Sequence, residues 1–425
     1  MKVRLAFGRD GAEVELPSRV QITILEAKFA EAEQSADAAL AEALSHPIGT
    51  PSLKELARGK KTAAISICDI TRPAPNRTVL PHVLRMLEQA GIAPSDIIIL
   101  IATGLHRAAT PQELHEIVGP EILSRYTVAS HDARDVSSHS DLGVTRSGTR
   151  VLIDRRFVES DLHISLGFIE PHLMLGFSGG RKLVAPGLAG EDTIKRLHSP
   201  FFMRDPRVVE GSFPENPLHD ELLEIAQIAR HDFIVDVALT RSRQIARVFA
   251  GDPVLAHATG VEFVRKATLA LLNAPVDAVI TTSAGYPLDL TYYQAVKGVT
   301  SASHIVKPGG TILLVAACQE GLGGAEFTHF ARRFPNAQAC LDATAKEPVV
   351  IDQWQLEKLA LVAQKAQLAF CMPGISEKDR SYLWGPVFEN PTQAVEAVCA
   401  KLPRGAHVAV IPEGPYVFSQ LAAKA

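Results

Sequence analysis

Several short segments of the chain carry side chains suited to anion binding or acid–base chemistry. The first is Asp69-Ile70-Thr71-Arg72-Pro73, which directly follows an apolar run. Arg72 offers a planar fork of donors that matches a carboxylate or a phosphate, and Asp69 can orient it. The alternative interpretation is a surface ion pair on a turn closed by Pro73, and the segment alone does not decide between the two.

The second segment, Ala102-Thr103-Gly104-Leu105-His106-Arg107, also follows an apolar run. Gly104 permits a tight turn or the close approach of a ligand to the backbone. His106 is placed where an imidazole can act as a base near neutral pH. A solvated loop histidine is the competing interpretation.

The third segment runs from Glu170 to Lys182 and contains Gly176-Phe177-Ser178-Gly179-Gly180-Arg181-Lys182. It does not match the phosphate-binding motif GxxxxGK[ST], because Arg181 takes the place of the second glycine and Leu183 that of the hydroxyl residue. ATP hydrolysis is therefore not indicated. Backbone N–H groups of the loop can still cradle a phosphate, and Lys182 can act as a nucleophilic amine.

Two further segments add a metal ligand and an anion site. His198, in Leu197-His198-Ser199-Pro200, is a suitable ligand for nickel, copper or zinc, although no metal-binding motif accompanies it. In the stretch Leu290 to Lys297, Gln294 and Lys297 are three residues apart and share a helix face. Together they can hold an anionic oxygen substrate; an ordinary solvated helix start is the alternative.

The elements that must position these residues alternate between strand and helix. Strands are predicted at 61–68, 96–102, 162–168, 233–239, 277–282, 311–317 and 407–411. Helices are predicted at 78–90, 111–118 with Thr110 as the N-cap, 217–229, 295–306 and 355–367. Such alternation predicts an α/β fold with largely parallel sheets flanked by helices.

The pattern restarts after the break Asn273-Ala274-Pro275, which predicts two domains, 1–272 and 276–425. The chemistry-bearing segments mostly follow predicted strands, and ligands of α/β sheets bind beyond the carboxyl ends of the strands. These segments are therefore expected to line a binding cleft.

Composition narrows the class of protein. The 425 residues are 47% hydrophobic and carry a net charge of −4, which is typical of a globular protein and disfavours a nucleic-acid binder. No apolar stretch is long enough to span a bilayer, and the N-terminus lacks a signal-peptide core, so a cytoplasmic enzyme is expected. The 5 cysteines form no CxxC pair and are expected to be small core residues.

Together, in this order and spacing, the segments resemble the nickel-pincer-nucleotide lactate racemase family over essentially the whole chain. By this resemblance Lys182 in GGRK is the cofactor attachment residue and His198 the nickel ligand. His106 and His172 resemble the two catalytic histidines. The resemblance also assigns a substrate-binding group and a cofactor-binding group: Arg72, Gln294, Lys297 and Tyr293 for the substrate, and Asp69, Ser178, Gly179 and Gly180 with Lys182 for the cofactor.

The resemblance implies an isomerase that inverts C2 of a small 2-hydroxy acid, either lactate or a close homologue. It further implies reversible hydride transfer to a lysine-tethered nickel-pincer nucleotide, which dedicated maturation proteins must supply. A larger 2-hydroxy acid or a sugar acid is the alternative substrate. Leu173, Met174 and Trp354 are candidates for the wall of a side-chain pocket, with core packing as the other interpretation.

Two classes of protein compete with this interpretation. An NAD-dependent dehydrogenase is disfavoured, because no GxGxxG follows a strand and opens a helix. A non-catalytic protein that binds a nucleotide or an organic acid is disfavoured by the pair His106 and His172, since binding alone needs no pair of bases.

Overall fold

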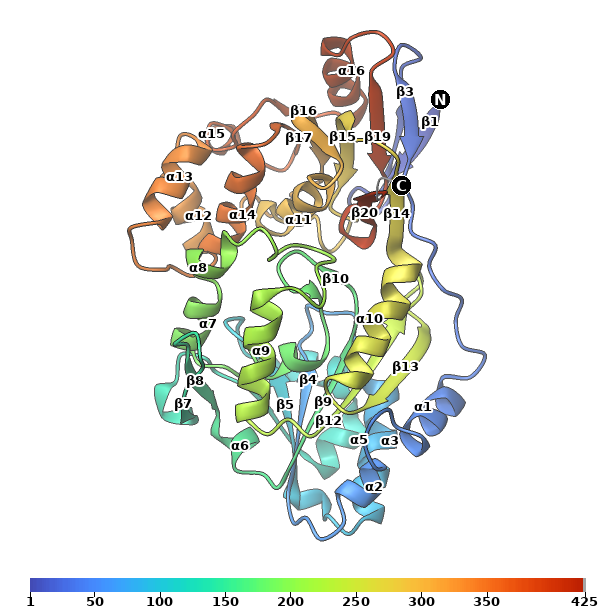
Figure 1. Cartoon of the computed structure of the whole chain (residues 1–425), viewed down its shortest axis with the longest axis vertical. Helices are drawn as coiled ribbons and strands as arrows, with labels where there is room; N and C mark the ends of the chain where they lie inside the picture. Colours follow the sequence, from blue (N-terminus) through green and yellow to red (C-terminus); the bar gives the residue numbers. More distant parts are fainter. Residues whose placement is uncertain (423–425) are drawn as a thin grey trace.

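The computed structural model describes residues 1–422, and the chain forms two lobes that each contain a six-stranded sheet (Figure 1). The N-terminal lobe lies in the lower half of the view and the C-terminal lobe in the upper half. The predicted α/β class with largely parallel, helix-flanked sheets is confirmed.

The sheet of the N-terminal lobe is parallel except at one edge. Its order is β13 (Ile245–Gly251), β12 (Phe233–Leu239), β9 (Leu162–Phe168), β4 (Ala63–Cys68), β5 (Ile97–Ala102) and β6 (Thr127–Ser130). Only β13 pairs antiparallel, with β12. β4 and β9 are buried along their whole length, as expected for central strands covered on both faces.

Helices cover both faces of this sheet. One face is packed by α1 (Ala36–Ser45), α2 (Leu53–Leu56), α3 (Asn76–Gln89), α4 (Pro111–Val118) and α5 (Pro120–Arg125). The other is packed by α6 (Arg155–Val158), α7 (Glu191–Leu197), α8 (Pro200–Met203) and α9 (Pro217–Ile228). α10 (Leu255–Thr268) lies against β12 and β13, and the hairpin of β7 (His139–Val144) and β8 (Arg150–Asp154) flanks α6 and α7. The predicted N-cap of α4 is confirmed, because Thr110 and Glu113 form a capping box.

The sheet of the C-terminal lobe is parallel throughout. Its order is β18 (Val387–Phe388), β17 (Gln367–Cys371), β16 (Val306–Val315), β15 (Val276–Thr282), β19 (His407–Ile411) and β3 (Gln21–Ile24). One face is covered by α11 (Tyr292–Ala302), α12 (Ala325–Ala331), α13 (Ala337–Thr344) and α14 (Gln353–Ala363). The other face is covered by α16 (Pro391–Lys401) and the hairpin of β1 (Lys2–Leu5) and β2 (Ala12–Glu15). α15 (Glu377–Arg380) lies on the loop that follows β17.

The placement of the first strands corrects the predicted domain 1–272. β3 pairs with β19 from Gln21↔His407 to Ile24↔Val410, and the hairpin before it packs into the C-terminal core. Pairing between strands so far apart in sequence leaves no local periodic signal, so the assignment by chain order was wrong for this segment. β14 (Leu269–Leu272) pairs in parallel with β20 (Phe418–Leu421), near the end of the described chain. This two-stranded sheet lies just before the point where the chain enters the C-terminal lobe at β15.

Two findings complete the fold. Within residues 1–422, no helix has both the length and the apolar character needed to cross a membrane. All five cysteines are buried and unpaired with one another, which confirms their prediction as core residues.

Candidate active site

The predicted site residues converge on one cavity between the two lobes. The cavity holds about 1300 Å³ of empty space, part of which is open to solvent. The N-terminal lobe contributes the loops after β4, β5 and β9, and the C-terminal lobe contributes α11 and the start of α14. Of the residues singled out from the sequence, all but Gly180 line it, including the predicted wall residues Leu173, Met174 and Trp354.

His106 is held by a carboxylate at the mouth of the cavity. Its Nδ1 lies 2.7 Å from Asp69 Oδ2, so Nδ1 carries the hydrogen and Nε2 keeps a free lone pair. Burial alone would raise the pKa of Asp69, but the hydrogen bonds from His106 and Thr71 and the charge of Arg72 lower it. Asp69 therefore stays ionised and orients the His106 ring, while its predicted contact with the cofactor stays a prediction.

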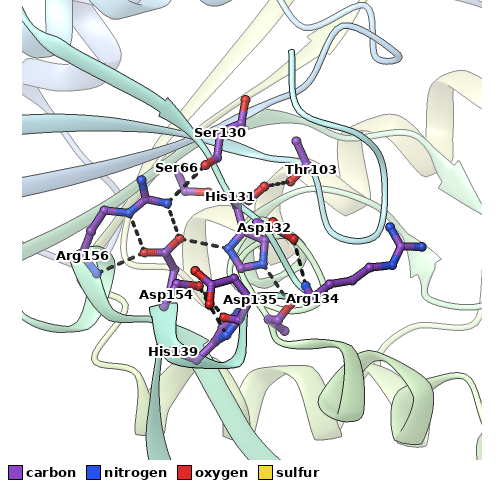
Figure 2. A network of polar contacts seen from close by, with 12 residues as sticks. Ser66, Thr103, Ser130, His131, Asp132, Arg134, Asp135, His139, Asp154 and Arg156 are labelled. Carbon is purple, nitrogen blue, oxygen red and sulfur yellow. Dashed lines mark hydrogen bonds and ion pairs between the residues drawn. The ribbon is translucent and has the colours of Figure 1, made fainter. Parts of the chain in front are cut away.

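A buried polar network stands behind the loop that carries His106 (Figure 2). The two ring nitrogens of His131 face acceptors, Asp154 Oδ2 at 2.9 Å and the carbonyl of Ala189 at 3.0 Å, so both nitrogens donate. Arg156 holds the same carboxylate at 2.6 Å. The Thr103 hydroxyl donates to the carbonyl of His131 at 2.7 Å. The network thus ties the His106 loop to the loop that follows Lys182.

We expect Asp154→Asn to lower the free energy of unfolding by ~1 to 3 kcal/mol, because an amide lacks the charge of the buried carboxylate that His131 and the half-exposed Arg156 contact. Burial alone would raise the pKa of Asp154, but Arg156 and His131 hold it well below its ordinary value of 3.8. The stabilisation is therefore present above pH ~4 and is lost as pH falls below that value. Urea unfolding at pH 7 and pH 3.5 measures both effects. Glu13→Gln, in the exposed pair with Lys2, should leave the midpoint unchanged.

His172 is prepared differently from His106. The backbone N–H groups of Met174 and Leu175 donate to its Nδ1 at 3.3 and 3.2 Å, so the hydrogen of the neutral ring sits on Nε2. Burial, together with the charges of Lys182, Lys297 and Arg72, lowers the pKa of His172 well below 6.5. In this conformation His172 is a neutral hydrogen-bond donor that faces the cavity.

Lys182 reaches the cavity from the 3₁₀ turn Gly180–Leu183. Burial, followed by the charge of Arg72, lowers the pKa of Lys182 to about 8. More of this amine is therefore unprotonated near neutral pH than in an ordinary lysine, which favours its use as a nucleophile.

Several polar groups of the glycine loop before Lys182 are already engaged within the protein. The N–H of Gly180 donates to Asp236 Oδ2 at 2.8 Å, and the Ser178 hydroxyl donates to the Phe168 carbonyl at 3.0 Å. Asp236 is fully buried behind the loop, and burial raises its pKa to about 7. An internal carboxylate therefore already accepts from the Gly180 N–H, and a contact of Gly180 with the cofactor stays a prediction. Ser178 and Gly179 line the cavity, but the Ser178 N–H also donates internally, to Glu170.

His198 presents one free nitrogen to the cavity. Its Nδ1 donates to the Ile194 carbonyl at 2.8 Å, which leaves the Nε2 lone pair available, and burial lowers its pKa to about 4. The Trp354 ring packs against it with centroids 4.2 Å apart. No group of three or more His, Cys, Asp or Glu side chains that could hold a metal occurs in residues 1–422. The donor set therefore fits a metal that arrives with most of its ligands on a cofactor and takes one from the protein.

Arg72, Lys297 and Gln294 form the cationic side of the cavity. Lys297 Nζ donates to Gln294 Oε1 at 2.7 Å, which confirms that the two residues share a helix face. Burial, then the charge of Arg72, lowers the pKa of Lys297 to about 7. Tyr293 lies beside them, and burial together with the neighbouring Asp352 raises its pKa. A carboxylate is the group that this arrangement accepts best.

We expect the KM for a carboxylate substrate to rise as pH increases through the pKa of Lys297, because the neutral amine loses its charge-assisted hydrogen bond. KM should rise by about 10- to 100-fold. Covalent attachment of the cofactor to Lys182 would remove a positive charge beside Lys297. The midpoint of the change in KM in the cofactor-bearing enzyme should therefore lie at or above pH 7. Lys297→Arg stays protonated and should flatten the profile between pH 6 and 9, whereas an unchanged profile in this variant would contradict the assignment.

Sequence reasoning missed several residues of the cavity. Glu170 lines it and was recognisable only as part of the Glu170-Pro171-His172 segment, where no role was assigned to it. Asp352 and Gln355 enter from the start of α14, and no local pattern marks them as functional.

The fold and the cavity together define a family. The chain matches the lactate racemase N-terminal domain over residues 7–211 and the lactate racemase C-terminal domain over residues 271–418. It therefore belongs to the lactate racemase family.

Particular relatives agree over most of their length. The chain is 36% identical over 380 residues to the lactate racemase of Lactiplantibacillus plantarum, covering 88% of each chain. It is 35% identical to that of Thermoanaerobacterium thermosaccharolyticum, covering 85% of each. The solved lactate racemase apoprotein from the latter organism superposes with a TM-score of 0.92 at 31% identity, covering 99% of this chain and 100% of that one. A Thermotoga maritima protein at 15% identity and a TM-score of 0.66, covering 94% and 100%, shares the fold alone.

Proposed function

We propose that this protein is an isomerase that interconverts the enantiomers of a small 2-hydroxy acid, with lactate as the first substrate to test. The observation that carries the proposal is the pair of differently prepared histidines beside a cationic carboxylate site. The relatives named lactate racemase share the chain over most of its length and support the same chemistry.

The substrate carboxylate binds to Arg72 and Lys297, with Gln294 holding the Lys297 ammonium in place. These contacts fix the plane of the substrate and place C2 between His106 and His172. Glu170 offsets part of the positive charge: its carboxylate raises the pKa of Lys297, whereas the charge of Arg72 lowers it.

The two histidines handle the hydroxyl proton. His106 accepts it at Nε2, and the resulting imidazolium is stabilised by Asp69 at 2.7 Å. His172 donates a hydrogen bond from Nε2 to the substrate oxygen. For the opposite enantiomer Nε2 of His172 must take the proton, so the ring hydrogen must first move from Nε2 to Nδ1, which then no longer accepts from the N–H groups of Met174 and Leu175.

A nickel-pincer nucleotide fits the cavity: Lys182 would hold it covalently and His198 Nε2 would complete the nickel coordination. When bound, it supplies a reversible acceptor for the hydride at C2. Leu173, Met174 and Trp354 form a buried apolar part of the cavity wall and limit the access of water. The protein depends on maturation proteins that make this group.

The test is a chiral assay. The protein is purified from cells that contain nickel and the cofactor-making proteins, and then incubated separately with L-lactate and with D-lactate. Either substrate should approach an equal mixture. No interconversion by protein shown to carry the cofactor would reject lactate, and the assay would pass to larger 2-hydroxy acids.

A further inference from the structure

A small side pocket lies beside the active-site cavity, and some of its lining residues have no role in the proposed function. It shares Arg72, Lys182 and Lys297 with the main cavity and extends past them to Glu210 and Tyr416. Arg72 and Lys297, the proposed carboxylate-binding residues, line both spaces, so this pocket lies next to the proposed substrate site.

Glu210 is the unusual member of the wall. It is 5% exposed, and its Oε2 atom has no hydrogen-bond partner among the described residues. The nearest charged-group candidate, His304 Nε2, is 3.8 Å away, and burial lowers the pKa of this imidazole to about 4, so it is neutral. Other buried side-chain atoms among the described residues also lack a partner, but this one belongs to a side chain that lines the small pocket.

The side chains that line the small pocket determine which substituent of a substrate can bind there. Burial and the neighbouring Glu170 raise the pKa of Glu210 well above its usual range, so at neutral pH it is a neutral carboxyl that both donates and accepts. A neutral carboxyl needs no ionic partner, so a neutral polar group is enough to pair it. An alkyl group would leave Glu210 without a partner. A hydroxyl group satisfies it, and the hydroxyl groups of Thr71 and Tyr416 extend the same polar wall.

We propose that Glu210 and Tyr416 form a subsite for a hydroxyl group on the substituent of the substrate, so that the enzyme favours 2-hydroxy acids that carry a second hydroxyl at C3. This inference rests on the proposed function and refines its substrate class. Glu210 acts here on specificity and takes no part in the transfer of the proton.

The test compares two substrates of nearly equal size, glycerate and 2-hydroxybutyrate, which differ by a hydroxyl in place of a methyl group. The loaded parent enzyme should show a kcat/KM about 10-fold or more higher for glycerate. Glu210→Gln should keep most of this preference, and Glu210→Leu should abolish or reverse it. Tyr416→Phe, a smaller change that tests the same wall, should reduce the preference even if Glu210→Leu does not fold.

The possible results distinguish a failure of the proposed subsite from a failure of the proposed function. If the parent interconverts lactate but shows no preference for glycerate, the subsite is wrong and the proposed function stands. The subsite is equally wrong if the folded, cofactor-bearing variants keep the parent's preference. If cofactor-bearing parent enzyme interconverts none of the three acids, the proposed function fails as well.

Discussion

Lys182→Arg is expected to remove both the covalent nucleotide and the racemase activity, with a loss on the order of 10⁴-fold or more. The amine of Lys182 is buried in the cavity with a pKa lowered to about 8, so it can be acylated, whereas a guanidinium stays protonated. Intact mass spectrometry of protein from cofactor-making cells measures the adduct, and the chiral assay measures the activity.

The control for this prediction is another lysine of the same lobe. Lys195 pairs with Glu191 on the surface of α7 at 2.6 Å, so Lys195→Arg should keep the adduct and the activity. An adduct of nucleotide mass on Lys182→Arg would show that attachment occurs elsewhere. Parent protein without an adduct, from cells that load a known lactate racemase, would reject the tether altogether.

His106→Ala is expected to lower kcat by about 10²- to 10⁴-fold with little change in KM, because it removes the base and leaves the carboxylate site intact. Asp69→Asn should also lower kcat, since an amide no longer fixes the Nδ1–H tautomer or stabilises the imidazolium. Steady-state kinetics in both directions measure these effects.

The matched control is a histidine–aspartate pair remote from the cavity. His82 Nε2 lies 2.8 Å from Asp37 Oδ1 on the outer helices, and His82→Ala should leave kcat unchanged. If His106→Ala kept parental kcat in both directions while carrying the cofactor, the assignment of His106 as a base would be wrong.

The sequence predicted the local elements well, because central parallel strands and amphipathic helices leave strong periodic signals. β9 and β12 were placed at their observed bounds. The edge strand β3 was misassigned, since its four residues are mostly half exposed and its partner β19 is far away in the chain. Patterns of this kind report on burial along the chain and carry no information on which strand lies beside which.

The site was predicted where short motifs follow strands, as for His106 and Lys182. The functions of individual groups depended on contacts across the fold. Asp69 was placed in the site, but only the structure pairs it with His106. The sequence likewise does not indicate that the Gly180 N–H donates to Asp236, which lies on β12 beside β9. Glu210 carries no motif, and its burial beside the cavity is a property of the folded chain alone.

The most direct test of the central claim follows the hydrogen at C2 during turnover in heavy water. L-Lactate is incubated with cofactor-bearing enzyme in D₂O, and the D-lactate formed is separated and analysed by mass spectrometry. The account predicts D-lactate that retains the original hydrogen at C2, because hydride leaves and returns without exchange with solvent. Rapid incorporation of deuterium at C2 of the product would show that a base removes this hydrogen as a proton, and would contradict the account.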